Sequence, residues 1–320
     1  MAGSWRTIAD EARFTPRFPP VRGADYVVVE RVERVELLRQ GDAPASPWRE
    51  LARLTIPPFG LAATTVVETI DPDVAEVPAN LLRFAVTFSN PMEEGSAAGH
   101  LHLLDESGTE LGGSLLGMPP ELWDRPHRRL TALVEPGRLK RGLQPNVQAG
   151  APLGEGDVVT LVVDAALRDS TGAELAREAR RTFRVGPAVR SRVDPARWEL
   201  RWPSTPGAPL VVRFDRPLDR ALVERCLRVR DGLGHPTLGR SLLQGDARTW
   251  VFTPAADPAG TGAGPTAPPA ALPHALHVDT TLEDLAGNSV RRVFDRDLGS
   301  EADDGIAAAE VVLTRVPICL

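Results

Sequence analysis

The sequence has 320 residues and a formal net charge of −6, with 42% hydrophobic and 25% charged residues. This composition is typical of a globular protein, so it excludes global disorder and a bundle of membrane helices. The length predicts about two domains, and the net acidic charge argues against a nucleic-acid partner.

The N-terminal segment, residues 1–58, contains the stretch ARFTPRFPPVRGADYVVV. It is similar to VFTPAADPAG followed by ALHVDTTL, which stands much later in the chain. We therefore expect residues 1–58 to be a partial or third β module. Half a sandwich exposes unpaired strand edges and an apolar face. The apolar C-terminal tail, AAEVVLTRVPICL, or a partner protein is expected to cover it.

An internal repeat begins at residue 81. The segments LLRFAVTFSNPM and PLVVRFDRPLDR pair Phe88 with Phe214 and Pro91 with Pro217, and both pairs are separated by 126 residues. The register continues into the next turn, where DESG stands opposite DGLG. A repeated unit of this length fixes the architecture before any single motif does.

The second half of the repeat has a shorter offset. Asp164 corresponds to Asp279 and Asp169 to Asp284, each 115 residues apart. The register therefore slips by 11 residues, and the first copy is expected to carry an insertion within LKRGLQPNVQAG.

Both copies are predicted to be β structure, because apolar residues alternate over short stretches separated by Gly- and Pro-containing turns. The predicted fold class is all-β, with tandem antiparallel sandwiches at 59–187 and 188–298. An acidic linker and a strand-like tail follow at 299–320. A short helix is expected at 218–227 with Asp219 as its cap.

Aromatic residues and low-complexity sequence complete this prediction. Trp202, Trp250 and Phe252 are expected in the core, because the chain has few aromatic residues to fill it. The segment 255–275, rich in Pro, Ala and Gly, is expected to be a flexible surface loop.

The repeated pattern resembles the bacterial Ig-like domains of the S-layer SbsA type. The resemblance rests on FAVTFSNPM, LLDESGTEL, VFTP and LEDLAGNSV, and it covers about 80–187 and 205–297. It implies tandem Ig-like modules of exported or cell-envelope proteins that act as spacers, adhesive surfaces or carriers. An extracellular, periplasmic or cell-envelope location and a protein partner follow from it, with an envelope glycan as a further possible partner.

The first thirty residues contain no apolar signal core, and no run approaches the ~18 apolar residues of a spanning helix. We therefore expect no integral membrane segment. Cys226 and Cys319 are too few for a disulfide framework. Two readings stay open: a pair of unbridged thiols, or a Cys226–Cys319 bridge that pins the tail.

A search for catalytic motifs finds no GxSxG, Walker A, HExxH or EF-hand pattern, and no cofactor is expected. His100 and His102 stand two apart on a predicted strand, which directs both rings to one face. They are candidate ligands of a transition metal. The alternative is a pair of solvated strand histidines.

Acidic residues recur at the predicted turns. Because carboxylate and amide oxygens bind Ca²⁺, five residues are candidate calcium ligands: Asp164, Asp169, Asp279, Asp284 and Asn288. The alternative is a structural role, because Asp before a Gly turn accepts backbone N–H bonds in an Asx-turn. We expect the structural role.

Basic residues gather in the first predicted sandwich. A strip that binds a polyanion would use six of them: Arg125, Arg128, Arg129, Arg138, Lys140 and Arg141. Charges on strand edges also discourage edge-to-edge pairing, which is the alternative explanation.

The sequence thus predicts a non-enzymatic Ig-like structural or interaction protein with no built-in catalytic pocket. A second hypothesis is an accessory subunit of a larger complex, docking through residues 1–58 and 306–320. A third is an enzyme that acts on an envelope polymer through paired Asp residues.

Overall fold

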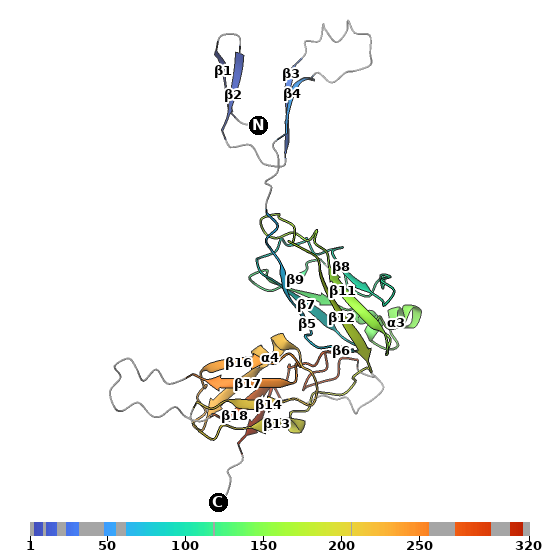
Figure 1. Cartoon of the computed structure of the whole chain (residues 1–320), viewed down its shortest axis with the longest axis vertical. Helices are drawn as coiled ribbons and strands as arrows, with labels where there is room; N and C mark the ends of the chain where they lie inside the picture. The colour runs from blue at the N-terminus through green and yellow to red at the C-terminus, as the bar shows by residue number, and fades with distance from the viewer. Residues whose placement is uncertain are drawn as a thin grey trace, which may run out of the picture. The chain divides into compact units, whose positions relative to one another are not determined.

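The computed structural model describes residues 3–8, 11–17, 24–31, 48–55, 62–117, 119–205, 207–255, 273–295 and 308–315 (Figure 1). The chain divides into two compact units, Met1–Ala62 and Ala63–Leu320. The fold is all-β with several antiparallel sheets, which confirms the predicted fold class.

The first unit contains two β-hairpins within its described residues. Strand β1 (Gly3–Ile8) pairs with β2 (Glu11–Pro16), and β3 (Asp25–Arg31) pairs with β4 (Trp48–Thr55). Trp5 stands opposite Phe14, and their ring centroids are 4.9 Å apart. Membership of residues 1–58 in a third sandwich stays a prediction.

In the part of the chain that the structure describes, the second unit contains two β-sandwiches (Figure 1). One sheet of the first sandwich has the order β5-β7-β10-β9 and the other β6-β12-β11-β8, with β6 parallel to β12. Its strands are β5 (Val67–Asp71), β6 (Glu76–Pro78), β7 (Arg83–Phe88), β8 (Leu101–Leu104), β9 (Leu122–Trp123), β10 (Arg129–Leu133), β11 (Val158–Val163) and β12 (Ala179–Gly186).

The core of the first sandwich lies between its sheets. Phe84 and Phe88 on β7 are fully buried, and so is Phe183 on β12. The rings of Phe84 and Phe183 meet across the sandwich at a centroid distance of 5.5 Å. Their burial follows from the period-two alternation of β-strands, which sends every second side chain to the inner face.

The predicted insertion in the first copy is helical. Helix α2 (Pro136–Leu139) and helix α3 (Gln144–Ala149) fill the connection between β10 and β11. Pro145 stands in the first turn of α3, where its missing N–H costs nothing.

The second sandwich has one sheet of order β13-β14-β17-β16 and another of order β15-β18-β19. Its strands are β13 (Glu199–Arg201), β14 (Leu210–Arg213), β15 (Leu227–Asp231), β16 (Gly239–Leu243), β17 (Thr249–Pro254), β18 (Pro273–Asp279) and β19 (Glu310–Thr314). A short 3-10 helix, η1 (Pro195–Arg197), precedes β13.

Strand β19 places the C-terminal tail in this sandwich. It pairs antiparallel with β18, from Ala275 opposite Thr314 to Asp279 opposite Glu310. The side chains of Val311 and Leu313 pack against the second core. The tail strand therefore completes a sheet of its own unit, where the sequence suggested a cover for residues 1–58. Cys319 lies outside the described residues, and so do residues 256–272 of the predicted loop 255–275. The last three residues of that predicted loop, 273–275, belong to strand β18, so the prediction was wrong at this end.

Helix α4 (Arg220–Cys226) confirms the helix predicted between strands of the second copy. The Asp219 carboxylate caps it by accepting the N–H of Leu222 at 3.0 Å. Trp250 and Phe252 are buried in the second core as predicted, and Trp202 packs against its border.

Candidate functional site

The acidic residues of the predicted turns bind backbone N–H groups. Asp169 Oδ1 accepts from the N–H of Thr171 at 2.9 Å and of Ala173 at 3.2 Å. Asp284 Oδ1 accepts in the same pattern from residues two and four positions later, at 3.0 and 2.9 Å. Between these donors stands a glycine with positive φ in each turn, Gly172 and Gly287.

The same turn recurs after the β8 and β15 strands. Asp105 Oδ1 accepts from the N–H groups of Ser107 and Thr109, both at 2.9 Å. Asp231 Oδ1 accepts from Leu233 and His235 at the same distance. The predicted structural role in an Asx-turn is thereby confirmed for Asp169 and Asp284, and Asp105 and Asp231 make the same kind of turn.

The pKa values of Asp169 and Asp284 are shifted in opposite directions. Burial acts to raise the pKa of Asp169, but hydrogen bonds from Thr171 and Thr65 outweigh it and leave the pKa below its usual value. Burial raises the pKa of Asp284 above its usual value, despite hydrogen bonds from Asn288 and Arg216. Equivalent positions in the two sandwiches thus differ in their electrostatics.

The remaining calcium candidates also hold local bonds. Asp164 Oδ1 accepts from the N–H of Ala166 at 2.9 Å, and Asp279 Oδ1 accepts from the N–H of Thr281 at 2.8 Å. Asn288 donates its amide to the carbonyl of Val189 at 2.9 Å. Within the described residues, no group of three or more His, Cys, Asp and Glu side chains is placed to hold a metal ion. The calcium alternative stays untested.

The two histidine candidates lie at the start of β8. The Nδ1 atom of His100 lies 3.6 Å from Asp164 Oδ2, and that of His102 lies 3.1 Å from Glu110 Oε1. Each imidazole thus stands beside a different carboxylate, and their role as metal ligands stays a prediction.

The residues of the candidate basic strip make separate local contacts. Arg138 donates to the carbonyls of Gly112, Gly113 and Gly150 and so ties loops to helix α2. Arg128 donates to the carbonyl of Phe88. Arg125 is exposed. A polyanion strip stays a prediction.

Other members of that strip reach residues of the second sandwich. The Lys140 ammonium lies 4.7 Å from the ring centroid of Phe294. Arg141 Nε lies 2.7 Å from Asp295 Oδ2, to which Arg190 Nε also donates at 3.0 Å. Burial acts to raise the pKa of Asp295, but the hydrogen bonds from both guanidinium groups keep the pKa below its usual value.

Arg83 makes two partly buried ion pairs between the sandwiches. It extends from β7 of the first sandwich to Asp219 and Glu283 of the second. Burial acts to lower the pKa of Arg83, but these two carboxylates outweigh it and raise the pKa. Beside this cluster, Arg220 of α4 donates to Asp71 Oδ1 of β5 at 3.0 Å.

Apolar and amide contacts add to these ion pairs. Together they form the junction between the two sandwiches. Leu285 belongs to the hydrophobic core of the first sandwich, and its carbonyl accepts the N–H of Leu82 at 2.9 Å. The connecting segment is held at Val189, whose carbonyl accepts amide N–H groups from Asn80 and Asn288. Both sandwiches thus contact each other and the segment that connects them.

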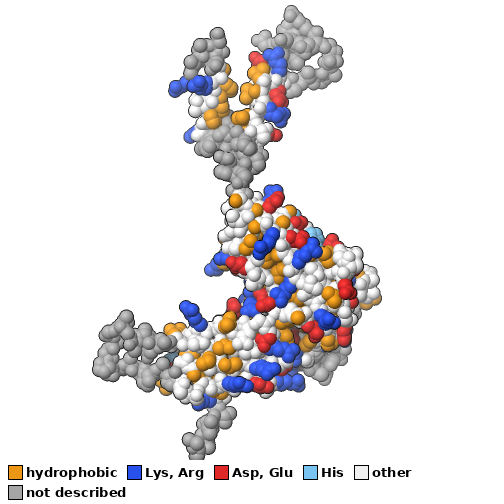
Figure 2. Space-filling view, viewed as in Figure 1, with side chains coloured by type: hydrophobic (Ala, Val, Ile, Leu, Met, Phe, Trp, Pro, Cys, Tyr) orange, Lys and Arg blue, Asp and Glu red, His pale blue; other side chains and the backbone are white. Residues whose placement is uncertain are grey.

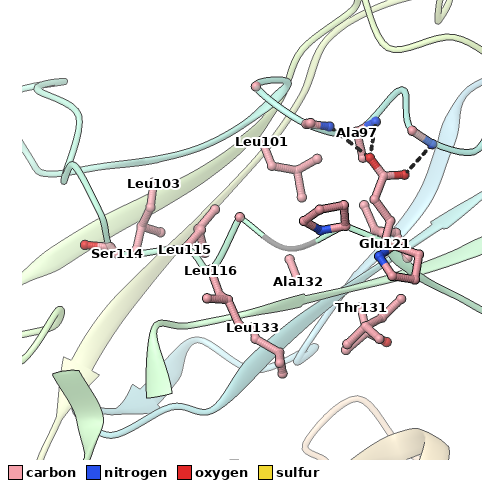
Figure 3. Close-up of a pocket in the computed structure, with 18 of the residues that line it drawn as sticks. Ala97, Leu101, Leu103, Ser114, Leu115, Leu116, Glu121, Thr131, Ala132 and Leu133 are labelled. Atoms are coloured by element: carbon pink, nitrogen blue, oxygen red, sulfur yellow. Dashed lines mark hydrogen bonds between the residues drawn. The ribbon is translucent and has the colours of Figure 1, made fainter. Parts of the chain in front are cut away.

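An apolar cavity of about 570 Å³ lies at one edge of the first sandwich (Figure 3). Leu101 and Leu103 of β8 form one wall, and Ala132 and Leu133 of β10 form the opposite wall. The segment around Leu116 closes a third side. No sequence motif indicated this cavity, and its described lining residues form no catalytic constellation.

The cavity arises because the edge strand is short. In the second sandwich, β16 pairs with β17 over five residues, from Gly239 to Leu243. In the first, β9 pairs with β10 only at Leu122 and Trp123. Pro119 and Pro120 precede this short strand, and proline has no N–H to continue the ladder.

Glu121 fixes the loop above the cavity. Its carboxylate accepts the backbone N–H groups of Gly95, Ala97 and Ala98 at 2.8–3.0 Å (Figure 3). It also accepts the Trp123 indole N–H at 2.7 Å. A charge-assisted bond of this kind is stronger than a neutral one. The only sequence signal for the cavity was the apolar run SLLGMPP, which no motif search selects.

No protein-family model matches the chain, and no curated protein matches it. Eight chains of solved structures match. The S-layer protein rSbsC(31-844) is 14% identical over 68% of this chain, with a TM-score of 0.28. This chain spans about a quarter of the SbsC chain, 24% of its length.

Two other matches are also β-rich. Alpha-2-macroglobulin from Escherichia coli, domains MG0-NIE-MG1, is 11% identical over 79% of this chain and 90% of its own, with a TM-score of 0.25. Rst D1-D2 is 9% identical over 59% and 81%, with a TM-score of 0.21. No helix of the described residues is both long and apolar enough to cross a membrane.

Proposed function

We propose that this chain is a non-enzymatic structural and interaction protein of a cell envelope or extracellular assembly. In this proposal the 63–320 unit is a stiff pair of Ig-like modules that sets the distance between the segments attached to it. The observation that carries the proposal is the ion-paired junction at Arg83, Asp219 and Glu283.

The junction favours one fixed orientation of the sandwiches. A partly buried charge left without its partner costs free energy, so tilting one sandwich away from the other would expose uncompensated groups. The Arg220–Asp71 and Arg141–Asp295 pairs add further points of attachment. Several attachment points oppose rotation about any single one.

The envelope location and the SbsA relationship rest on the resemblance in the sequence motifs. The sandwiches also share one strand order, because β5-β7-β10-β9 corresponds in position to β13-β14-β17-β16. This agreement supports the proposal that both are copies of one module. Tandem modules of this kind serve as spacers and interaction surfaces in the family that the motifs resemble.

A second candidate is an accessory subunit that docks through its N-terminal unit. Hydrophobic side chains reach the surface of the hairpins (Figure 2). Trp5, Leu51 and Leu54 are each more than half exposed, at 60%, 57% and 54%. Exposed apolar groups on strands suit a partner that presents an apolar β surface.

The stiff-pair proposal is tested by electron-spin distance measurements on the full chain. Spin labels would be placed at Glu155→Cys and Ser241→Cys, exposed positions in the first and second sandwich, with Cys226→Ala and Cys319→Ser in the background. A narrow distance distribution is expected, and it should broaden when Arg83→Ala is added. A broad distribution without Arg83→Ala would overturn the proposal.

The docking candidate is tested separately. Removal of residues 1–58 should leave the spin-label distance unchanged and abolish assembly with the partner found by crosslinking the full chain. Retained assembly would reject the N-terminal unit as the docking part.

A further inference from the structure

We propose that the cavity in the first sandwich binds a single hydrocarbon chain whose end group is neutral or cationic. This inference goes beyond the structural role above and does not depend on it, because the cavity lies within one sandwich.

The size and lining of the cavity fit such a ligand. Small-molecule sites typically enclose about 300–1,000 Å³ and are mostly apolar, and this cavity has about 570 Å³. Leu101, Leu103, Leu116 and Leu133 present branched aliphatic surface to it. Burial of methylene groups against such walls is the main favourable contribution that the site offers.

The cavity opens to solvent, because Gly117, Pro119 and Pro120 of its lining are exposed. A ligand that enters it therefore displaces water from apolar walls. The short β9 strand keeps the space open, where β16 covers the corresponding edge of the second sandwich.

The charge around the cavity selects the end group. Among the described residues that line it, the ionisable ones are Glu94, Glu110 and Glu121, and no Lys or Arg is present. Glu121 already accepts several N–H groups, and Glu110 Oε1 lies 3.1 Å from His102 Nδ1. Glu94 and Glu110 are both exposed. A carboxylate or phosphate at the end of the chain would meet like charge, and an ammonium would meet opposite charge.

The neighbouring Arg138 does not reverse this preference. Its Nη1 donates to the carbonyls of Gly112 and Gly113, and the hydroxyl of Ser114 lies 3.5 Å away. The guanidinium is thus directed at the loop backbone, behind the wall that Ser114 forms.

A hydrocarbon chain fits this place better than an added β-strand does. The N–H of Leu111 already donates to the carbonyl of Leu103, and the N–H of Leu116 donates to that of Leu133, both at 2.8 Å. These bonds occupy the edges of both walls. Strand addition needs free backbone groups at an edge.

The test uses the full chain and the neutral apolar dye N-phenyl-1-naphthylamine, whose fluorescence rises in an apolar site. Dodecylamine, dodecanol and dodecanoate would compete with the dye below their micelle concentrations. Dodecylamine and dodecanol are expected to displace the dye, and dodecanoate about tenfold less well than dodecylamine because of the acidic rim.

Variants locate the binding. The Ala132 side chain points into the cavity (Figure 3), so Ala132→Phe should fill it and abolish saturable dye binding. Ala176→Phe, at an exposed position of the same sandwich, should bind the dye as the unmodified chain does. The surface variant Glu94→Gln with Glu110→Gln leaves the walls intact and should reduce the preference for dodecylamine over dodecanoate.

Each contrary result would overturn the proposal. Absence of saturable dye binding to the unmodified chain rejects the site. Unchanged binding in folded Ala132→Phe places the dye elsewhere, and equal or better competition by dodecanoate rejects the end-group preference. If the stiff-pair function holds, the distribution of spin-label distances remains narrow in all of these cases. Failure of one proposal can therefore be distinguished from failure of the other.

Discussion

Arg83 and Asp219 stand on different sandwiches and form an ion pair, with the arginine Nε atom 2.8 Å from the carboxylate Oδ2. The other oxygen of Asp219 caps helix α4 through the N–H of Leu222. One carboxylate therefore stabilises a helix start in the second sandwich and a cation from the first. Loss of Asp219 should therefore weaken both the junction and the helix, whereas loss of Arg83 removes only the pairs at the junction.

Arg83→Ala should destabilise the 63–320 unit by about 2–3 kcal/mol, because it leaves Asp219 and Glu283 partly buried without a cation. Urea unfolding followed by tryptophan fluorescence measures the change. Arg180→Ala is the matched control, because the Arg180–Glu178 pair lies at the surface of the first sandwich. A loss as large in the control would contradict the special role of the junction.

Gly172→Ala and Gly287→Ala should differ, although both glycines occupy equivalent turns with positive φ. Adding a Cβ at Gly172 meets no atom within 4 Å, so its cost is the backbone strain of about 1–2 kcal/mol. At Gly287 the new atom would stand 2.4 Å from Leu82 Cδ2 of the first sandwich. We expect about 2–5 kcal/mol there, since overpacking adds to the strain. Equal urea midpoints for both variants would show that this contact is absent.

Asp169→Asn should reduce the loss of stability on acidification. Burial opposes ionisation of Asp169, but hydrogen bonds from Thr171 and Thr65 hold its pKa below the ordinary value of 3.8. Its stabilising contribution is therefore complete above that value and is lost as the pH falls through the folded pKa. The stability of the unmodified chain minus that of Asp169→Asn should decrease as the pH falls.

Asp284→Asn should show the opposite trend. Burial raises the pKa of Asp284 above 3.8, so the folded chain binds this proton more tightly than the unfolded chain does. The cost of its buried charge is present at neutral pH and is relieved as the pH falls through the raised pKa. The same stability difference should therefore increase on acidification. Urea unfolding between about pH 3 and 7 measures both trends, and parallel trends would contradict the assignment.

Leu313→Asp should destabilise the second sandwich by about 2–4 kcal/mol, because it places a charge against the apolar core. Leu313 packs inward from β19, whereas its neighbour Val312 is 47% exposed. Val312→Asp should thus change stability by less than about 1 kcal/mol. Amide exchange of β18 locates the effect. Similar costs for both variants would mean that β19 does not form the observed strand.

Local features of the fold were predictable from the sequence because their causes are local. The Asx-turn at Asp169 needs only an acid, a glycine three positions later and the N–H groups on either side of that glycine. The Asp219 cap of α4 follows from its position before an apolar helical pattern. Alternating apolar residues were enough to indicate the buried strands around Phe84 and Phe214.

Features that depend on distant segments were not predictable. Arg83 and Glu283 are 200 residues apart, and nothing in either neighbourhood marks them as partners. The pairing of β18 with β19 crosses a long connection, so the tail was not recognised as a strand of the second sandwich. The cavity depends on the length of β9 relative to its neighbours. A pattern of apolar residues in the sequence does not show that an edge strand is too short to cover its neighbour.

The claim that the sandwiches form a single unit is tested most directly by native-state hydrogen exchange in increasing urea. The slowest amides of β11 and β18 should exchange through one common unfolding event with equal free energy and equal urea dependence, and Arg83→Ala should separate them. Different free energies for β11 and β18 in the unmodified chain would contradict the claim.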